Sequence, residues 1–223
     1  MKFPRRRLLN ALLLALLAFA DSPVSRAAEP FFEKVDLFTA AQDGYKLYRI
    51  PGIAVTKRGT VLAYCEARKS DRGDWGTIDI MLRRSTDGGK TWSPRAKIAD
   101  VPGPKSKNLV ALAQKLATPG EVTYNNPTAI ADADGSVHFL FCLEYARCFM
   151  MHSDDDGVTW SQPLEITGTF DKFRPEYDWK VLATGPGHGI QLKTGRLVVP
   201  VWLSLGTGGH AHRPSVTAVI YSD

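Results

Sequence analysis

The sequence predicts an all-β fold of the β-propeller type, and three observations lead to that prediction. An octapeptide with the pattern S-x-D-x-G-x-T-W occurs at residues 85–92 and again at 153–160, where it begins 68 residues later. Three strand-like runs precede each copy, and a short fourth run follows it. Repeats of four antiparallel strands are the sequence signature of propeller blades arranged around an axis.

The runs in each repeat are rich in Val, Ile, Leu and Tyr, as strands are. The first repeat has runs at 50–56, 60–67, 78–85 and 96–99, the second at 127–131, 136–143, 146–153 and 163–166, and the third at 189–192, 196–203 and 216–222. Turn-forming residues at 57–59, 132–135 and 193–195 separate the first two runs of each repeat. Ser222 and Asp223 fall where a third octapeptide would begin, so we expect an incomplete propeller.

The octapeptide is interpreted as a structural turn and not as a reactive site. Its Asp can accept hydrogen bonds from nearby backbone amides, and its Gly can adopt the positive φ that a tight turn needs. Its Trp supplies a large apolar side chain for the neighbouring sheet.

The up-and-down order of the strands sorts the loops onto two faces, with both octapeptides on one of them. The other face collects long polar and aromatic segments, at Arg49, 69–77, 105–126, 144–145, 170–188 and 204–215. We expect the binding site on this second face, because loops held by a rigid scaffold usually carry function.

One of these loops is expected to contain a short helix. Leu109, Leu112, Ala113 and Leu116 have the i, i+3, i+4, i+7 spacing of an amphipathic helix, which predicts one over residues 107–117. We interpret this helix as a local support for the loop face.

The first residues have the order of a secretory signal peptide. Three arginines at 5–7 precede an apolar stretch at 8–19 and a small-residue segment at 25–28. We therefore expect a signal peptide over 1–27, the propeller over 28–223, and a secreted or periplasmic protein. The alternative is an uncleaved anchor, although the apolar stretch is shorter than the ~20 residues that span a bilayer. We expect no membrane span after cleavage.

The basic charge of the chain comes mostly from this first segment. The net charge is +5, and residues 1–27 supply +4 of it through five basic residues and one acidic residue. The remainder is close to neutral, so we expect no nucleic-acid partner.

The three cysteines, Cys65, Cys142 and Cys148, all lie in strand-like sequence. One disulfide plus a free thiol is an alternative in an exported protein, but we prefer three buried reduced thiols. None has metal-site spacing, and His210 and His212 have no obvious third ligand. We therefore expect neither a metal nor another cofactor.

With these features in view, the chain resembles the exo-α-sialidases, or neuraminidases, of bacterial type (glycoside hydrolase family 33-like) over residues 36–223. The octapeptides match that family's Asp boxes, or BNR repeats, which also occur in propellers that are not sialidases. The resemblance implies a six-bladed sialidase propeller, of which this chain holds about the first three blades. More specific matches are Tyr48-Arg49-Ile50-Pro51, similar to the family's F/Y-R-I-P motif, then Glu66-Ala67-Arg68, Leu82-Arg83-Arg84-Ser85, and the segments 184–189 and 195–200.

The resemblance implies two principal site residues. Arg49 corresponds to one of three arginines that bind the substrate carboxylate, and a planar guanidinium makes two parallel charge-assisted bonds to such a group. Asp74, nine residues before Arg83, corresponds to the catalytic acid/base. Asp71 is the main alternative, and Asp79 fits better as part of a strand.

Three further residues have weaker assignments. Glu66 and Arg68 resemble a pair that lines the far side of the sugar ring near its O4, and the alternative is a structural salt bridge. Trp202 corresponds to an aromatic that some members keep near the glycerol side chain, and the alternative is an ordinary buried Trp.

The implied activity is retaining hydrolysis of terminal sialic acid from sialylated glycans, glycoproteins or glycolipids. Sialidases use a tyrosine nucleophile, because the substrate carboxylate would repel an Asp or Glu. In the family this tyrosine, its glutamate and two more arginines lie in later blades, and all seven tyrosines here come too early. The chain alone is therefore expected to be inactive. The alternatives are a non-catalytic propeller that binds acidic sugars and a related glycosidase with another substrate.

Overall fold

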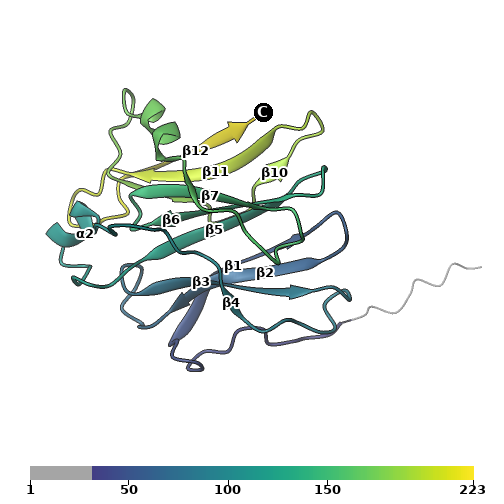
Figure 1. Ribbon diagram of the computed structural model, residues 1–223. Helices are drawn as coiled ribbons and strands as arrows, with labels where there is room; N and C mark the ends of the chain where they lie inside the picture. The colour runs from purple at the N-terminus through teal and green to yellow at the C-terminus, as the bar shows by residue number, and fades with distance from the viewer. Residues whose placement is uncertain (1–31) are drawn as a thin grey trace, which may run out of the picture. The chain divides into compact units, whose positions relative to one another are not determined.

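The computed structural model describes residues 32–223, and the predicted signal peptide lies outside the described residues. Asp36–Asp223 forms one compact unit, which contains three four-stranded antiparallel sheets that do not close into a ring (Figure 1). The all-β prediction is confirmed. None of the helices among the described residues has the length and apolar character needed to cross a membrane.

The strands follow the predicted repeats, and their ends agree with the predicted runs to within three residues. The first sheet is β1 (Leu47–Val55), β2 (Val61–Arg68), β3 (Ile78–Ser85) and β4 (Ala96–Lys97) in that order, and the second is β5 (Tyr124–Ala131), β6 (Val137–Leu143), β7 (Arg147–Ser153) and β8 (Leu164–Glu165). The third is β10 (Ile190–Gln191), β11 (Leu197–Ser204) and β12 (Ser215–Ser222), with β9 (Val181–Thr184) also paired to β11. Strand β9 was not predicted, because four buried residues show no periodicity.

The predicted helix is shorter than expected, and its predicted apolar face is wrong. Helix α2 spans Leu109–Ala113, and Leu109 is 79 % exposed, whereas Ala111 is buried. The reason is the N-cap residue, Asn108, which accepts a hydrogen bond from Val110 N and donates its side-chain amide to Tyr145 O and Lys180 O. These bonds fix the orientation of the helix. A 3₁₀ helix, η1 (Thr167–Phe173), was not predicted.

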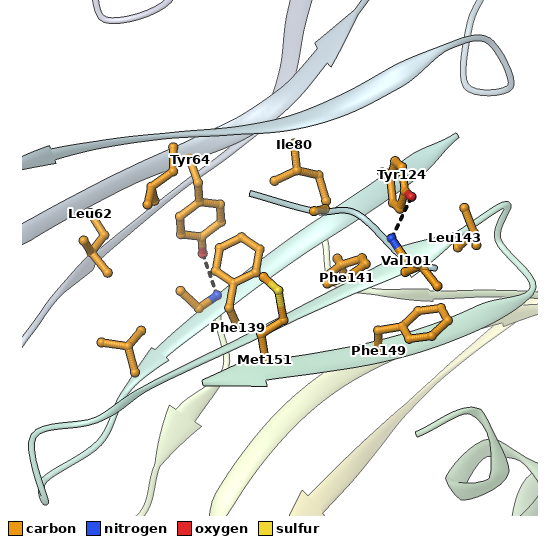
Figure 2. Close-up of a cluster of buried hydrophobic side chains, with 14 residues drawn as sticks. Leu62, Tyr64, Ile80, Val101, Tyr124, Phe139, Phe141, Leu143, Phe149 and Met151 are labelled. Atoms are coloured by element: carbon orange, nitrogen blue, oxygen red, sulfur yellow. Dashed lines mark hydrogen bonds between the residues drawn. The ribbon is translucent and has the colours of Figure 1, made fainter. Parts of the chain in front are cut away.

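The largest hydrophobic cluster lies between the first and second sheets (Figure 2). Its members include Leu62, Tyr64 and Ile80 from the first sheet and Phe139, Phe141 and Met151 from the second. The hydroxyls of two buried tyrosines accept backbone hydrogen bonds, from Ala129 N to Tyr64 and from Val101 N to Tyr124, at 3.0 Å each. A second cluster joins the second and third sheets, so consecutive sheets pack through apolar faces.

All three cysteines are buried free thiols, which confirms the preferred interpretation. Cys142 and Cys148 face each other across β6 and β7, and Cys65 packs beside Ala67 and Met81. None of them lies on an exposed surface.

The octapeptides form the predicted turns. The carboxylates of Asp87 and Asp155 accept hydrogen bonds from the backbone amide and hydroxyl of the Thr four residues later, Thr91 or Thr159. These bonds stabilise the charged form and hold the pKa of both Asp at about 2. The structural interpretation is therefore confirmed.

The second octapeptide also joins two sheets, which the sequence pattern did not indicate. Thr60 Oγ1 and Arg58 Nη1, both from the turn between β1 and β2, donate to the carboxylate of Asp156 at 3.1 and 3.2 Å. Arg84 Nε donates to the backbone oxygen of Asp156 at 2.6 Å. The first octapeptide has Gly88 at this position and has no side chain to make such contacts.

We predict that Asp156→Gly lowers the free energy of unfolding by about 1–3 kcal/mol, because Thr60 is buried and loses its acceptor. Glycine is the replacement that keeps the turn, because Asp156 has a φ of 59°, which glycine adopts without strain, while the side-chain contacts are lost. Urea denaturation measures the change. Asp154→Ala, at an aspartate with a 79 % exposed side chain, should leave stability nearly unchanged, and equal losses in the two variants would contradict the inter-sheet role.

Candidate active site

The first strand of every sheet is distorted near the same face. The pairing with β2 shifts between Arg49 and Gly52, the pairing with β6 shifts between Asn125 and Thr128, and the first strand of the third sheet is divided into β9 and β10. At each distortion a residue with positive φ precedes a proline. The three pairs are Ile50-Pro51, Asn126-Pro127 and Gly185-Pro186, with φ of 51°, 52° and 65° at the first residue. Such bulges redirect side chains, and proline suits them because it cannot donate to the ladder.

The three redirected residues line a single cavity of about 170 Å³. Its wall contains Arg49, Ile50, Arg68, Asp74, Asn126, Tyr145, Ala183, Gly185, Pro186, Trp202 and His212. These residues come from all three sheets and from the loops predicted to share one face, so a cavity lies where the sequence predicts the site. Four of the predicted site residues, namely Arg49, Arg68, Asp74 and Trp202, line the cavity together.

Asp74 is held between two guanidinium groups. Its Oδ1 accepts hydrogen bonds from Arg68 Nη1 at 2.7 Å and from Arg49 Nη1 at 3.2 Å. Arg68 Nη1 also donates to Gly73 O, which fixes the loop that carries Asp74. The Asp74 side chain is 30 % exposed and that of Arg49 is 52 % exposed, so both are accessible to a ligand.

Glu66 lies behind Arg68 and has no exposed surface. Its Oε2 accepts from Arg68 Nε and Nη2 at 3.0 and 2.5 Å, and its Oε1 accepts from Asn126 N, in the second sheet, at 2.8 Å. Burial raises the pKa of Glu66, and Arg68 and the Asn126 amide oppose that shift. The structure therefore places Glu66 as the support of Arg68, whereas only Arg68 reaches the cavity.

The hydrogen bonds continue from Glu66 into the third sheet. Asn126 O accepts a hydrogen bond from Thr184 Oγ1 at 2.6 Å. Glu66, Asn126 and Thr184 are all buried. A chain of buried polar contacts thus joins Asp74, Arg68, Glu66, Asn126 and Thr184 across three sheets.

Several cavity residues were not predicted as site residues, and the most central is His212, which was considered from the sequence only as a metal ligand. Its ring is stacked on Trp75 at a centroid distance of 5.8 Å and lies 5.4 Å from the ring of Tyr145 and 5.2 Å from that of Trp202. The segments 144–145 and 204–215 were predicted on this face, but no motif singled out these side chains. Trp202 therefore lines the cavity and also encloses a histidine.

Tyr145 is positioned by a strained turn. Glu144 and Tyr145 have φ of 57° and 51°, which L residues seldom adopt. Lys107 Nζ donates to Glu144 Oε1 at 2.9 Å, with 8 % and 1 % of the two side chains exposed, and thereby ties the α2 loop to this turn. Burial raises the pKa of Tyr145 well above its ordinary value, so its hydroxyl stays protonated.

The alternatives to Asp74 lie elsewhere. Asp71 is exposed and is absent from the cavity wall, and Asp79 on β3 contacts Tyr45 and Lys97. Among residues 32–223, no group of three or more His, Cys, Asp or Glu side chains is placed to hold a metal ion.

This arrangement can carry out two chemical tasks. The half-exposed guanidinium of Arg49 offers charge-assisted donors to an acidic ligand, whereas the buried guanidinium of Arg68 is already bonded to Glu66, Gly73 and Asp74. A partly exposed carboxyl between them can exchange a proton with a bound molecule.

We predict that Glu66→Gln lowers the free energy of unfolding by about 3–5 kcal/mol, because it removes the fully buried counter-charge of Arg68 and leaves only the partly exposed Asp74 to pair with that guanidinium. The matched control is Glu165→Gln, which removes a carboxylate paired with Arg147 where the two side chains are 40 % and 36 % exposed. The control should cost less than about 1 kcal/mol. Guanidinium chloride denaturation of both variants measures the difference, and a small loss in Glu66→Gln would show that the buried network is not needed.

The comparisons with known proteins agree on one family. The family model described as "BNR repeat-like domain" matches residues 50–223. An exo-alpha-sialidase of Aspergillus fumigatus is 26 % identical over 87 % of this chain and 53 % of its own length, and a sialidase of Bacteroides fragilis is 33 % identical over 72 % of this chain and 31 % of its own. The chain thus spans about half the length of the fungal relative and about a third of the bacterial one.

Solved structures agree with the fold. A structure described as Hadza microbial sialidase Hz136 superposes with a TM-score of 0.61 at 25 % identity, over 82 % of this chain and 36 % of that one. Trypanosoma rangeli sialidase in complex with sialic acid has a TM-score of 0.55 at 20 % identity, over 79 % of this chain and 28 % of its own, which supports the fold alone. With three repeated sheets, two matching turns and a family model that covers most of its length, the chain belongs to the BNR repeat-like family and is homologous to sialidases.

Proposed function

We propose that the chain is the sialic-acid-binding part of an exported exo-α-sialidase that releases terminal sialic acid from glycoconjugates with retention of configuration. The observation that carries this proposal is the cavity in which Arg49 and Arg68 hold Asp74 on the loop face of three sheets. The sialidase relatives support the substrate class. The arginines and apolar stretch at the start of the sequence support export to the periplasm or the medium.

Arg49 is suited to bind the carboxylate of a sialic acid. Its guanidinium has five N–H donors, its side chain is half-exposed, and one nitrogen contacts Asp74 at 3.2 Å. In the free protein the Asp74 carboxylate therefore occupies part of the place that a substrate carboxylate would take.

Asp74 is suited to be the acid/base once the ligand has arrived. A ligand carboxylate that engages Arg49 draws this cation away from Asp74 and frees the carboxyl to face the ligand. Asp74 can then protonate the leaving oxygen and later activate water. Arg68, fixed by Glu66, keeps the carboxyl facing the cavity throughout.

The nucleophile is not proposed among the residues of the cavity wall. Tyr145 is the tyrosine of the cavity wall, but its pKa is raised by burial and by the nearby Glu66 and Asp74 carboxylates, whereas a nucleophile needs an accessible phenolate. The chain alone is therefore proposed to bind sialic acid without hydrolysing sialosides.

One observation favours the alternative of a non-catalytic module that binds acidic sugars. Oδ1 of Asp74 is bonded to both guanidinium groups, an ion-pair arrangement that is suited to binding an acidic ligand beside it. Presence or absence of a reactive tyrosine at the cavity distinguishes the two functions.

We predict that the 223-residue protein binds N-acetylneuraminic acid and that Arg49→Ala weakens this binding about 10-fold to 100-fold, the loss of a charge-assisted hydrogen bond. Isothermal titration calorimetry measures the affinity. Arg196→Ala is the matched control, because Arg196 is 41 % exposed and pairs with Asp223 outside the cavity. The methyl ester of the sugar should bind as weakly to the wild-type protein as the free acid binds to Arg49→Ala. Equal binding of acid and ester would rule out carboxylate recognition.

A further inference from the structure

His212 lies among three aromatic rings at the edge of the cavity, with 25 % of its side chain exposed. It lies on the loop between β11 and β12, and its ring meets those of Trp75, Tyr145 and Trp202, which come from the other two sheets and from β11. Its Nε2 is buried and has no hydrogen-bond partner among the described residues. Its Nδ1 lies 3.7 Å from Asp74 Oδ2, just beyond hydrogen-bond length.

The two oxygens of Asp74 therefore have different partners. Oδ1 accepts from both arginines, whereas Oδ2 faces the imidazole of His212. A neutral imidazole at 3.7 Å leaves Oδ2 available to a ligand or a proton. A protonated imidazole would instead form an ion pair with Oδ2, and the surrounding aromatic faces would stabilise its charge.

Charged and titratable groups reach His212 from several elements. Asp74 on the β2–β3 loop favours its protonation, whereas Arg68 at the end of β2 and His210 on its own loop oppose it. Arg49 on β1 lines the same cavity, and Tyr145 on the β6–β7 turn stays protonated. Burial is the largest effect and lowers the pKa of His212 below its ordinary value.

We infer that His212 is a positioning residue for Asp74, and that its protonation pairs Oδ2 with the imidazolium and thereby withdraws Asp74 from proton transfer. This inference rests on the proposed function only in giving Asp74 the role of acid/base. The contact itself is a property of the free protein. Its consequence is a site in which Asp74 can act as an acid only while His212 is neutral.

Nuclear magnetic resonance of the imidazole Cε1–H groups tests this coupling in the 223-residue protein. The chain has five histidines, and His212→Gln identifies the signal of interest. In the wild type this signal should titrate with a midpoint below about 6.5. Asp74→Asn removes the neighbouring negative charge and should lower the midpoint by about one pH unit. Asp74→Glu keeps the charge and should restore a midpoint closer to that of the wild type, and His210→Gln should leave the transition in place.

The direction of the shift separates coupling from damage to the fold. An unfolded Asp74→Asn protein would expose His212 and move its midpoint up towards about 6.5, opposite to the expected change. A midpoint that Asp74→Asn does not lower overturns the inference, whatever the protein binds. Conversely, a lowered midpoint in a protein that fails to bind N-acetylneuraminic acid upholds the His212–Asp74 coupling and counts against the proposed function alone.

Discussion

The candidate site depends on the hydrogen bonds that the buried carboxylate of Glu66 accepts. A charge without solvent is tolerated only when other groups compensate it, and Glu66 receives donors from Arg68 in its own sheet and from the Asn126 amide in the next. Arg68 is consequently immobilised and presents one nitrogen to Asp74. Because Asn126 O also accepts from Thr184, the hydrogen bonds that start at this carboxylate link all three sheets.

The bulges explain why such a carboxylate is needed. Ile50 and Asn126 adopt a left-handed conformation within strands, and for a β-branched residue such as Ile50 this is unfavourable by about 1–2 kcal/mol. A bulge also leaves backbone groups without partners in the ladder, and Glu66 accepts one of these amides at the second sheet. Regular pairing on both sides of each bulge retains the strained conformation, and the redirected residues meet in one cavity.

The features that could be predicted from the sequence are those that short-range patterns determine. Strand runs, turns and octapeptides depend on neighbours within a few residues, and Arg49 and Asp74 lie in or near recognisable motifs. His212 and Tyr145 are different, because their importance arises only when loops from three sheets converge. The error at α2 has the same origin: leucines at helical spacing predict a buried face, but the long-range bonds of Asn108 turn that face towards solvent.

The charges of the cavity also define a conflict between binding and acid function. The positive charges of Arg49 and Arg68 balance the negative charges of Asp74 and Glu66. A protonated His212 would therefore give the cavity an excess positive charge, which favours an anionic ligand. The same proton would pair the imidazolium with Asp74 Oδ2 and so withdraw this carboxylate from proton transfer. Since burial lowers the pKa of His212, the neutral imidazole prevails near neutral pH, and the burial of this ring favours proton transfer over ligand affinity.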